Sequence, residues 1–70
     1  MATILLEQGE SFEHFHTASS GTVLREGRAR LHMNGRILEL QRDVAVVVPA
    51  DTSHTLVNIG PGTAVISCIH

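Results

Sequence analysis

The chain has 70 residues, of which 43% are hydrophobic, and a formal net charge of −2 at pH 7. This length predicts a single domain over residues 1–70 with a small core, because chains this short bury only about 60% of their unfolded surface. All five basic residues are arginines scattered along the chain, and no apolar run approaches the roughly 18 residues of a membrane span. Composition therefore argues against a nucleic-acid partner and against a membrane partner.

Short strands separated by turns are predicted along the whole chain. Residues 1–7 have neither the positive flank nor the long apolar segment of a signal peptide, so we expect a cytoplasmic protein. Strands are predicted over residues 3–6, 12–16, 22–25, 28–33, 36–40, 44–48, 54–58 and 63–69. With no helix signal, this spacing of short strands and turns is typical of an all-β barrel or sandwich.

The segment 12–16 places His14 and His16 on one face, because alternate side chains of a strand point the same way. The two residues would lie about 6.7 Å apart along the strand, so that two imidazoles can share one metal ion. Glu13 and Phe15 fall on the opposite face, where the apolar ring of Phe15 needs a cover that a dimer partner would supply.

The pair Asn34-Gly35 lies between two alternating runs and predicts a tight hairpin, because a type I′ turn needs positive φ at both positions. The resulting register puts Arg30 opposite Glu39 as a cross-strand ion pair. His32 falls on the outer face. The inner face is predicted to collect the apolar residues Ala29, Leu31, Met33, Leu38 and Leu40.

The segment 44–48 is apolar without alternation, which predicts a strand buried on both faces. In so short a chain its outer face would meet another subunit, so we expect a homodimer. The last strand contains Cys68, the single cysteine, which is expected to be a small buried hydrophobic residue. Without an intramolecular disulfide, a metal or a partner subunit would have to stabilise this small fold.

The N-terminal half resembles the first cupin motif, which runs Gly, five residues, His-x-His, three or four residues, Glu, six residues, Gly. Gly9, His14, His16 and Gly27 appear in this order, with four residues rather than five before His14. Ser20 stands at the position of the motif Glu.

The C-terminal half resembles the second cupin motif, which runs Gly, five residues, Pro-x-Gly, two residues, His, three residues, Asn. Pro49, His54 and Asn58 fall in register, and Asp43 and Asp51 replace the two glycines. The two motifs cover residues 9–58. The resemblance to the cupin superfamily implies a small, truncated double-stranded β-helix, a barrel of the jelly-roll type.

The same resemblance implies that His14, His16 and His54 converge inside the barrel and hold a divalent transition metal. Imidazole suits Zn, Cu, Fe and Ni, and Mn is a further candidate for this site. Ser20 cannot supply the carboxylate that is the usual fourth ligand, but three-histidine centres function in cupins such as the thiol dioxygenases. One hypothesis is therefore a metal-dependent oxygenase acting on a small organic ligand. The alternative is a metal-free module that binds a small molecule or has a structural role, with the histidines hydrogen-bonded in a polar pocket.

Other polar residues are weaker candidates. Glu13 is expected to be a solvated or interface carboxylate. Thr22 and Asn58 face inward, where either could orient a ligand or a histidine, and Asn58 has a second role open to it as a cap on the following turn. Arg36 at the barrel rim meets either an anionic ligand or solvent, and His70 is expected at the surface. The chain has no tyrosine, which argues against the acid–base pair of the sugar-epimerising cupins.

Overall fold

The computed structural model describes residues 2–69, which form eight strands and no helix. The strands are β1 (Ala2–Leu6), β2 (Ser11–His14), β3 (Ser20–Glu26), β4 (Ala29–Met33), β5 (Arg36–Glu39), β6 (Val46–Val48), β7 (His54–Asn58) and β8 (Ala64–Ile69). His70 lies outside the described residues. Within the described part of the chain, nothing forms a helix that is long and apolar enough to cross a membrane.

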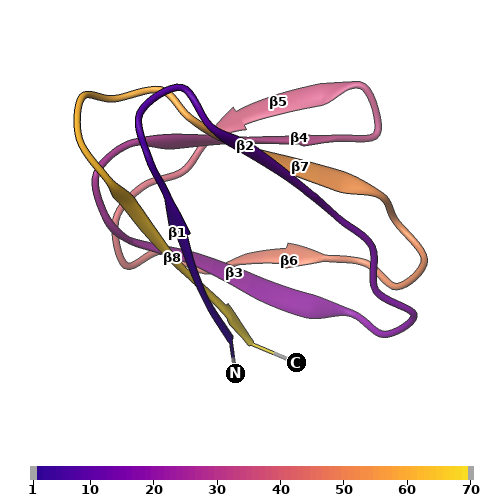
Figure 1. Cartoon of the computed structure of the whole chain (residues 1–70). Helices are drawn as coiled ribbons and strands as arrows, with labels where there is room; N and C mark the ends of the chain where they lie inside the picture. The colour runs from indigo at the N-terminus through magenta and orange to yellow at the C-terminus, as the bar shows by residue number, and fades with distance from the viewer. Residues whose placement is uncertain (1, 70) are drawn as a thin grey trace.

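Two antiparallel sheets of four strands face each other, with strand orders β1-β8-β3-β6 and β2-β7-β4-β5 (Figure 1). We call the first sheet A and the second sheet B. The chain changes sheet at every connection except the hairpin between β4 and β5. This arrangement confirms the predicted all-β fold of the jelly-roll type.

The core lies between the inner faces of the two sheets and follows from alternation along the strands. In β7, for example, His54, Leu56 and Asn58 are buried, whereas Thr55 and Val57 are half-buried on the other face. The buried apolar cluster draws on most strands and consists of Leu6, Leu24, Ala29, Leu31, Leu40, Val48, Leu56, Ala64, Ile66 and Cys68.

The predicted hairpin is present, with Asn34 and Gly35 at φ of 52° and 72° as a type I′ turn requires. Arg30 lies opposite Glu39 in the register, but the predicted ion pair between them is wrong. The Glu39 carboxylate instead accepts a hydrogen bond of 2.9 Å from Arg28, which precedes β4.

Leu38 is not part of the core, because this residue is 41% exposed. It does lie opposite the buried Leu31, and therefore on the inner face that the sequence predicts. However, β5 is the edge strand of sheet B and makes its main contacts with β4 alone, so no strand of sheet A covers it. All residues of β5 are exposed for this reason.

The apolar segment 44–48 is only partly a strand. β6 covers Val46–Val48, and Val48 alone is buried in the core. Val44 and Val47 are 50% and 68% exposed, so this chain by itself does not bury the segment on both faces. Its cover by a second subunit stays a prediction.

Backbone turns explain how aspartate replaces glycine in the second motif. Asp43 and Asp51 adopt positive φ, at 64° and 58°, a conformation that aspartate tolerates better than most residues. The turns that glycine usually makes are therefore kept. Gly27 could not be replaced by aspartate in the same way. Its φ is 80°, and an added Cβ would lie 2.6 Å from the carbonyl oxygen of Thr63.

Candidate metal centre

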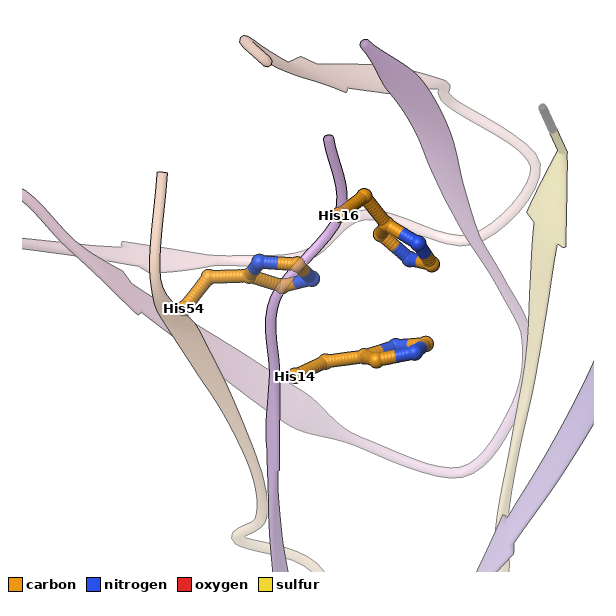
Figure 2. A group of neighbouring side chains, drawn as sticks. All are labelled: His14, His16 and His54. Carbon is orange, nitrogen blue, oxygen red and sulfur yellow. The ribbon is translucent and has the colours of Figure 1, made fainter. Parts of the chain in front are cut away.

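Three histidines meet between the two sheets, at the end of the barrel that carries the loops β2–β3 and β6–β7. His14 ends β2 and lies directly opposite His54, the first residue of β7. Direct cross-strand neighbours share a face, and here it is the inner one. Figure 2 shows the two rings extending from their strands to the same side, with the ring of His16 above that of His14.

His16 joins this pair although it lies beyond the end of β2, two residues after the strand stops. Its carbonyl oxygen accepts a hydrogen bond of 2.8 Å from the backbone N–H of Asp51. This bond ties the loop that follows β2 to the loop that precedes β7. Asp51, with its positive φ, is therefore part of the turn that holds His16 near His54.

The three rings are close enough to serve one ion. The ring centroid of His16 is 3.9 Å from that of His14 and 5.8 Å from that of His54, and the His14 and His54 centroids are 5.6 Å apart. One nitrogen from each ring can be chosen so that all three nitrogens lie within 4.8 Å of one another. Two atoms that each lie about 2.0–2.1 Å from one metal are at most about 4.2 Å apart, so small movements of these rings would bring all three nitrogens onto one ion.

Hydrogen bonding fixes the orientation of His54. Its Nδ1 lies 3.2 Å from the carbonyl oxygen of Thr52, which accepts a hydrogen bond only if Nδ1 carries the proton. The lone pair is then on Nε2, which is buried and has no hydrogen-bond partner among the described residues. A metal-binding histidine commonly donates its other N–H to a carbonyl in this way, so His54 fits a metal.

The surroundings of the three histidines include no carboxylate ligand. The group that could hold an ion among residues 2–69 contains His14, His16 and His54 only. Ser20, at the position of the motif Glu, is buried at the start of β3. With three imidazoles, a bound metal would keep positions open for water or for a ligand.

Thr22 is the buried polar residue that follows Ser20 on the same face of β3. It is 0% exposed, and its hydroxyl has no hydrogen-bond partner in the described part of the chain. It lies opposite Cys68 of β8, where burial raises the pKa of the thiol. Near Thr22, the inner face of sheet A therefore carries a neutral hydroxyl and a neutral thiol and, among residues 2–69, no charged group.

The remaining candidates lie elsewhere. Asn58 caps a turn: its amide donates to the carbonyl oxygens of Leu6 and Gly62, and its side-chain oxygen accepts from the N–H of Gly60. Glu13 and Arg36 are exposed. His32 is half-buried on the outer face of sheet B, opposite Thr55, as the alternation of β4 predicts.

The sequence prediction missed a second polar cluster. Glu13, Thr55 and His32 lie side by side on the outer face of sheet B and line one pocket. The signal was present in the alternation, because each of these residues is a chain neighbour of an inward residue: His14, His54 or Met33.

The family model described as a cupin domain matches residues 2–70, and the chain therefore belongs to the cupin family. A comparison with curated proteins finds no match.

Solved structures agree with this assignment. The Cupin_2 domain of an XRE family transcriptional regulator from Enterobacter cloacae is 22% identical, with 97% of this chain and 76% of that chain covered and a TM-score of 0.84. A cupin superfamily protein from Desulfitobacterium hafniense is 20% identical, with 97% and 64% covered and a TM-score of 0.78. A predicted oxalate decarboxylase from Thermotoga maritima is 20% identical, with 96% and 62% covered and a TM-score of 0.76. This chain thus spans about two thirds of the length of the last two proteins, and the similarity shows a shared fold.

Proposed function

We propose that this protein is a mononuclear metal-dependent cupin that uses His14, His16 and His54 to hold a divalent transition metal, which is Fe, Mn, Ni, Cu or Zn. The observation that carries the proposal is the set of three ring nitrogens within 4.8 Å of one another. The Nδ1 of His54, held by the Thr52 carbonyl oxygen, supports it because that contact leaves the buried Nε2 as the donor atom.

We further propose that the centre acts on a small organic ligand as an oxygenase. A metal with open positions supplies Lewis-acid and redox chemistry to a ligand bound beside it. The three neutral imidazoles leave the positive charge of the ion largely uncompensated, so an anionic or electron-rich ligand is favoured. The buried hydroxyl of Thr22 on the inner face of β3 is available to orient such a ligand.

A second candidate function is a metal-free binding module, which is favoured by the buried Ser20 at the position of the motif Glu. A similar cupin domain, that of the E. cloacae protein, belongs to a transcriptional regulator.

The two functions are separated by equilibrium dialysis of the metal-stripped protein against each of the five ions, followed by oxygen uptake with small organic thiols and acids as probes. Binding of one ion per chain, together with oxygen uptake that needs the ion, supports the oxygenase. Absence of binding for every ion supports the metal-free module.

We also propose that the protein is a cytoplasmic homodimer. Cys68 is a free, buried thiol, which does not require an oxidising compartment. The exposed side chains of Val44, Val47 and Phe15 support a surface that a second copy covers.

A further inference from the structure

A pocket of about 340 Å³ lies at the outer face of sheet B. This volume is within the range of small-molecule sites, about 300–1,000 Å³. The pocket is separate from the three histidines, none of which lines it. The residues that matter for its chemistry are Glu13, Arg36, His32, Ser53, Thr55 and Ile37.

The register of sheet B brings four of these residues into one row, with one residue from each strand. Arg36 is not in this row: it lies opposite Met33, directly after the Asn34-Gly35 turn, and lines the pocket from its rim. Glu13 of β2 lies opposite Thr55 of β7, Thr55 lies opposite His32 of β4, and His32 lies opposite Ile37 of β5. Directly opposed residues share a face, so this row crosses the sheet on the side away from the core. His14 and His54 lie in the neighbouring row on the inner side. Figure 1 shows β2 and β5 in the layer that carries the pocket.

Polar side chains around the pocket have no partners within the described protein. No side chain among Glu13, Arg36, His32, Ser53 and Thr55 makes a hydrogen bond or an ion pair with another described residue. Two ion pairs form elsewhere on the surface of the described chain, between Arg25 and Asp43 at 3.1 Å and between Arg28 and Glu39 at 2.9 Å. The pocket thus keeps its donors and acceptors available to a ligand.

The two formal charges of the pocket are opposite and come from opposite edges of the sheet. Glu13 belongs to β2 and Arg36 to β5, which are the two edge strands of sheet B. A strand spacing of about 4.8 Å places these strands about 14 Å apart across the sheet. Between the charges lie the imidazole of His32, the hydroxyl of Thr55 and the exposed apolar side chain of Ile37.

We propose that this pocket binds a short ω-amino carboxylate, which is a molecule with an ammonium group at one end and a carboxylate at the other. The ammonium group pairs with the Glu13 carboxylate, and the carboxylate pairs with the Arg36 guanidinium. The methylene chain between them packs against His32 and Ile37, while the hydroxyls of Ser53 and Thr55 complete the hydrogen bonds. Because the charges of the pocket balance, a zwitterion is preferred to an amine or an acid alone.

The test is an NMR titration of the metal-free protein, in which backbone amide shifts are followed with γ-aminobutyrate and δ-aminovalerate as probes. The expected result is saturable shifts confined to the pocket strands, with weaker binding of butylamine and butyrate, each of which carries one of the two charges. Absence of saturable shifts with both zwitterions at millimolar concentration would overturn the proposal. So would equal binding of the single-charge compounds.

Variants then test the two charged residues. Glu13→Gln and Arg36→Gln each remove one charge from an exposed position, and each is expected to weaken zwitterion binding about fivefold, because an exposed ion pair contributes up to about 1 kcal/mol. Glu26→Gln and Arg42→Gln make the same charge changes outside the pocket and should bind as the wild type does. An unchanged affinity in either pocket variant would overturn the two-charge arrangement.

Discussion

His54 is the residue whose environment says most about the function of this protein. Its ring is buried, with 2% of the residue exposed, although an imidazole is polar and burial without a partner costs free energy. The Thr52 carbonyl satisfies Nδ1, and only a ligand from outside the described chain would satisfy Nε2. The fold therefore holds an unpaired nitrogen in a buried position, and metal binding would offset the free-energy cost of burying it.

Replacement of this residue tests its role against a histidine outside the centre. We expect His54→Ala to lose most of the metal that the wild type binds, because two imidazoles hold a divalent ion poorly. His32→Ala should retain wild-type metal content, since His32 lies on the outer face of sheet B. Elemental analysis of the two variants makes the comparison, and equal metal content in both would rule out the assignment of His54.

Thr22 carries a second buried polar group without a partner among the described residues. A buried hydroxyl left unsatisfied costs about 1–3 kcal/mol. We therefore expect Thr22→Val to raise the free energy of unfolding of the metal-free, ligand-free protein by about 1 kcal/mol. Urea unfolding measures the difference, with the exposed loop residue Thr17→Val as the control. A clear loss of stability in Thr22→Val would show that the hydroxyl is already satisfied in the folded protein.

At the scale of elements, the centre depends on contacts that hold strand ends together. The bond from Asp51 to His16 joins the two loops that carry the histidines. At the far end of β7, Asn58 fixes the turn before β8 and the end of β1 through its three side-chain hydrogen bonds. One strand, β7, thus bears a histidine of the centre at its start and the cap that anchors it at its end.

Loss of the Asn58 side chain, which caps this turn, should lower the stability of the fold. We expect Asn58→Ala to lower the free energy of unfolding by about 2–4 kcal/mol, because each bond contributes about 1 kcal/mol and buried backbone groups are left without partners. Ser53→Ala, at an exposed position directly before β7, should change stability by less than about 0.5 kcal/mol. Thermal or chemical unfolding of the two variants provides the measurement. A loss in Asn58→Ala no larger than in the control would show that the cap is dispensable.

Alternation along single strands predicted which residues share a face, whereas the meeting of the three histidines was implied by the resemblance to the cupin motifs. The period of two put His14 and His54 on inner faces, and Asn34-Gly35 fixed the register of β4 with β5. Features that depend on the packing of one sheet against another could not be read from the sequence. Leu38 has the pattern of a core residue, yet the edge position of β5 leaves it exposed.

Tertiary contacts also decided features around the histidines. His16 has the strand pattern but lies beyond β2, where a loop contact from Asp51 holds it. Asn58 has the inward position of a ligand-binding residue, and only its contacts show that it caps a turn. The outer pocket arises because three strands bring single polar residues, Glu13, Thr55 and His32, into one row that Ile37 of β5 extends. That row requires the full strand order of sheet B.

For the whole molecule, small size makes the exposed apolar surface of sheet A significant. Val47 of β6 and Leu5 of β1 are 68% and 63% exposed, and these strands form the two edges of the sheet. A chain with so small a core gains stability from burying such residues against a second copy.

We therefore expect a homodimer at micromolar concentration, measured by sedimentation equilibrium. Val47→Arg should shift the equilibrium toward monomer, because a charge would be buried in the interface, whereas Arg42→Gln should not. A wild-type protein that sediments as a monomer would remove the dimer from this account.

The measurement that tests the central claim most directly is the metal content of protein purified without an affinity tag or a chelator, determined by elemental analysis on the wild type and His14→Ala in parallel. The account predicts close to one equivalent of Fe, Mn, Ni, Cu or Zn per chain in the wild type and loss of that metal in the variant. Wild-type protein that holds no metal, even after soaking with each ion, would contradict it, as would equal metal content in the two proteins.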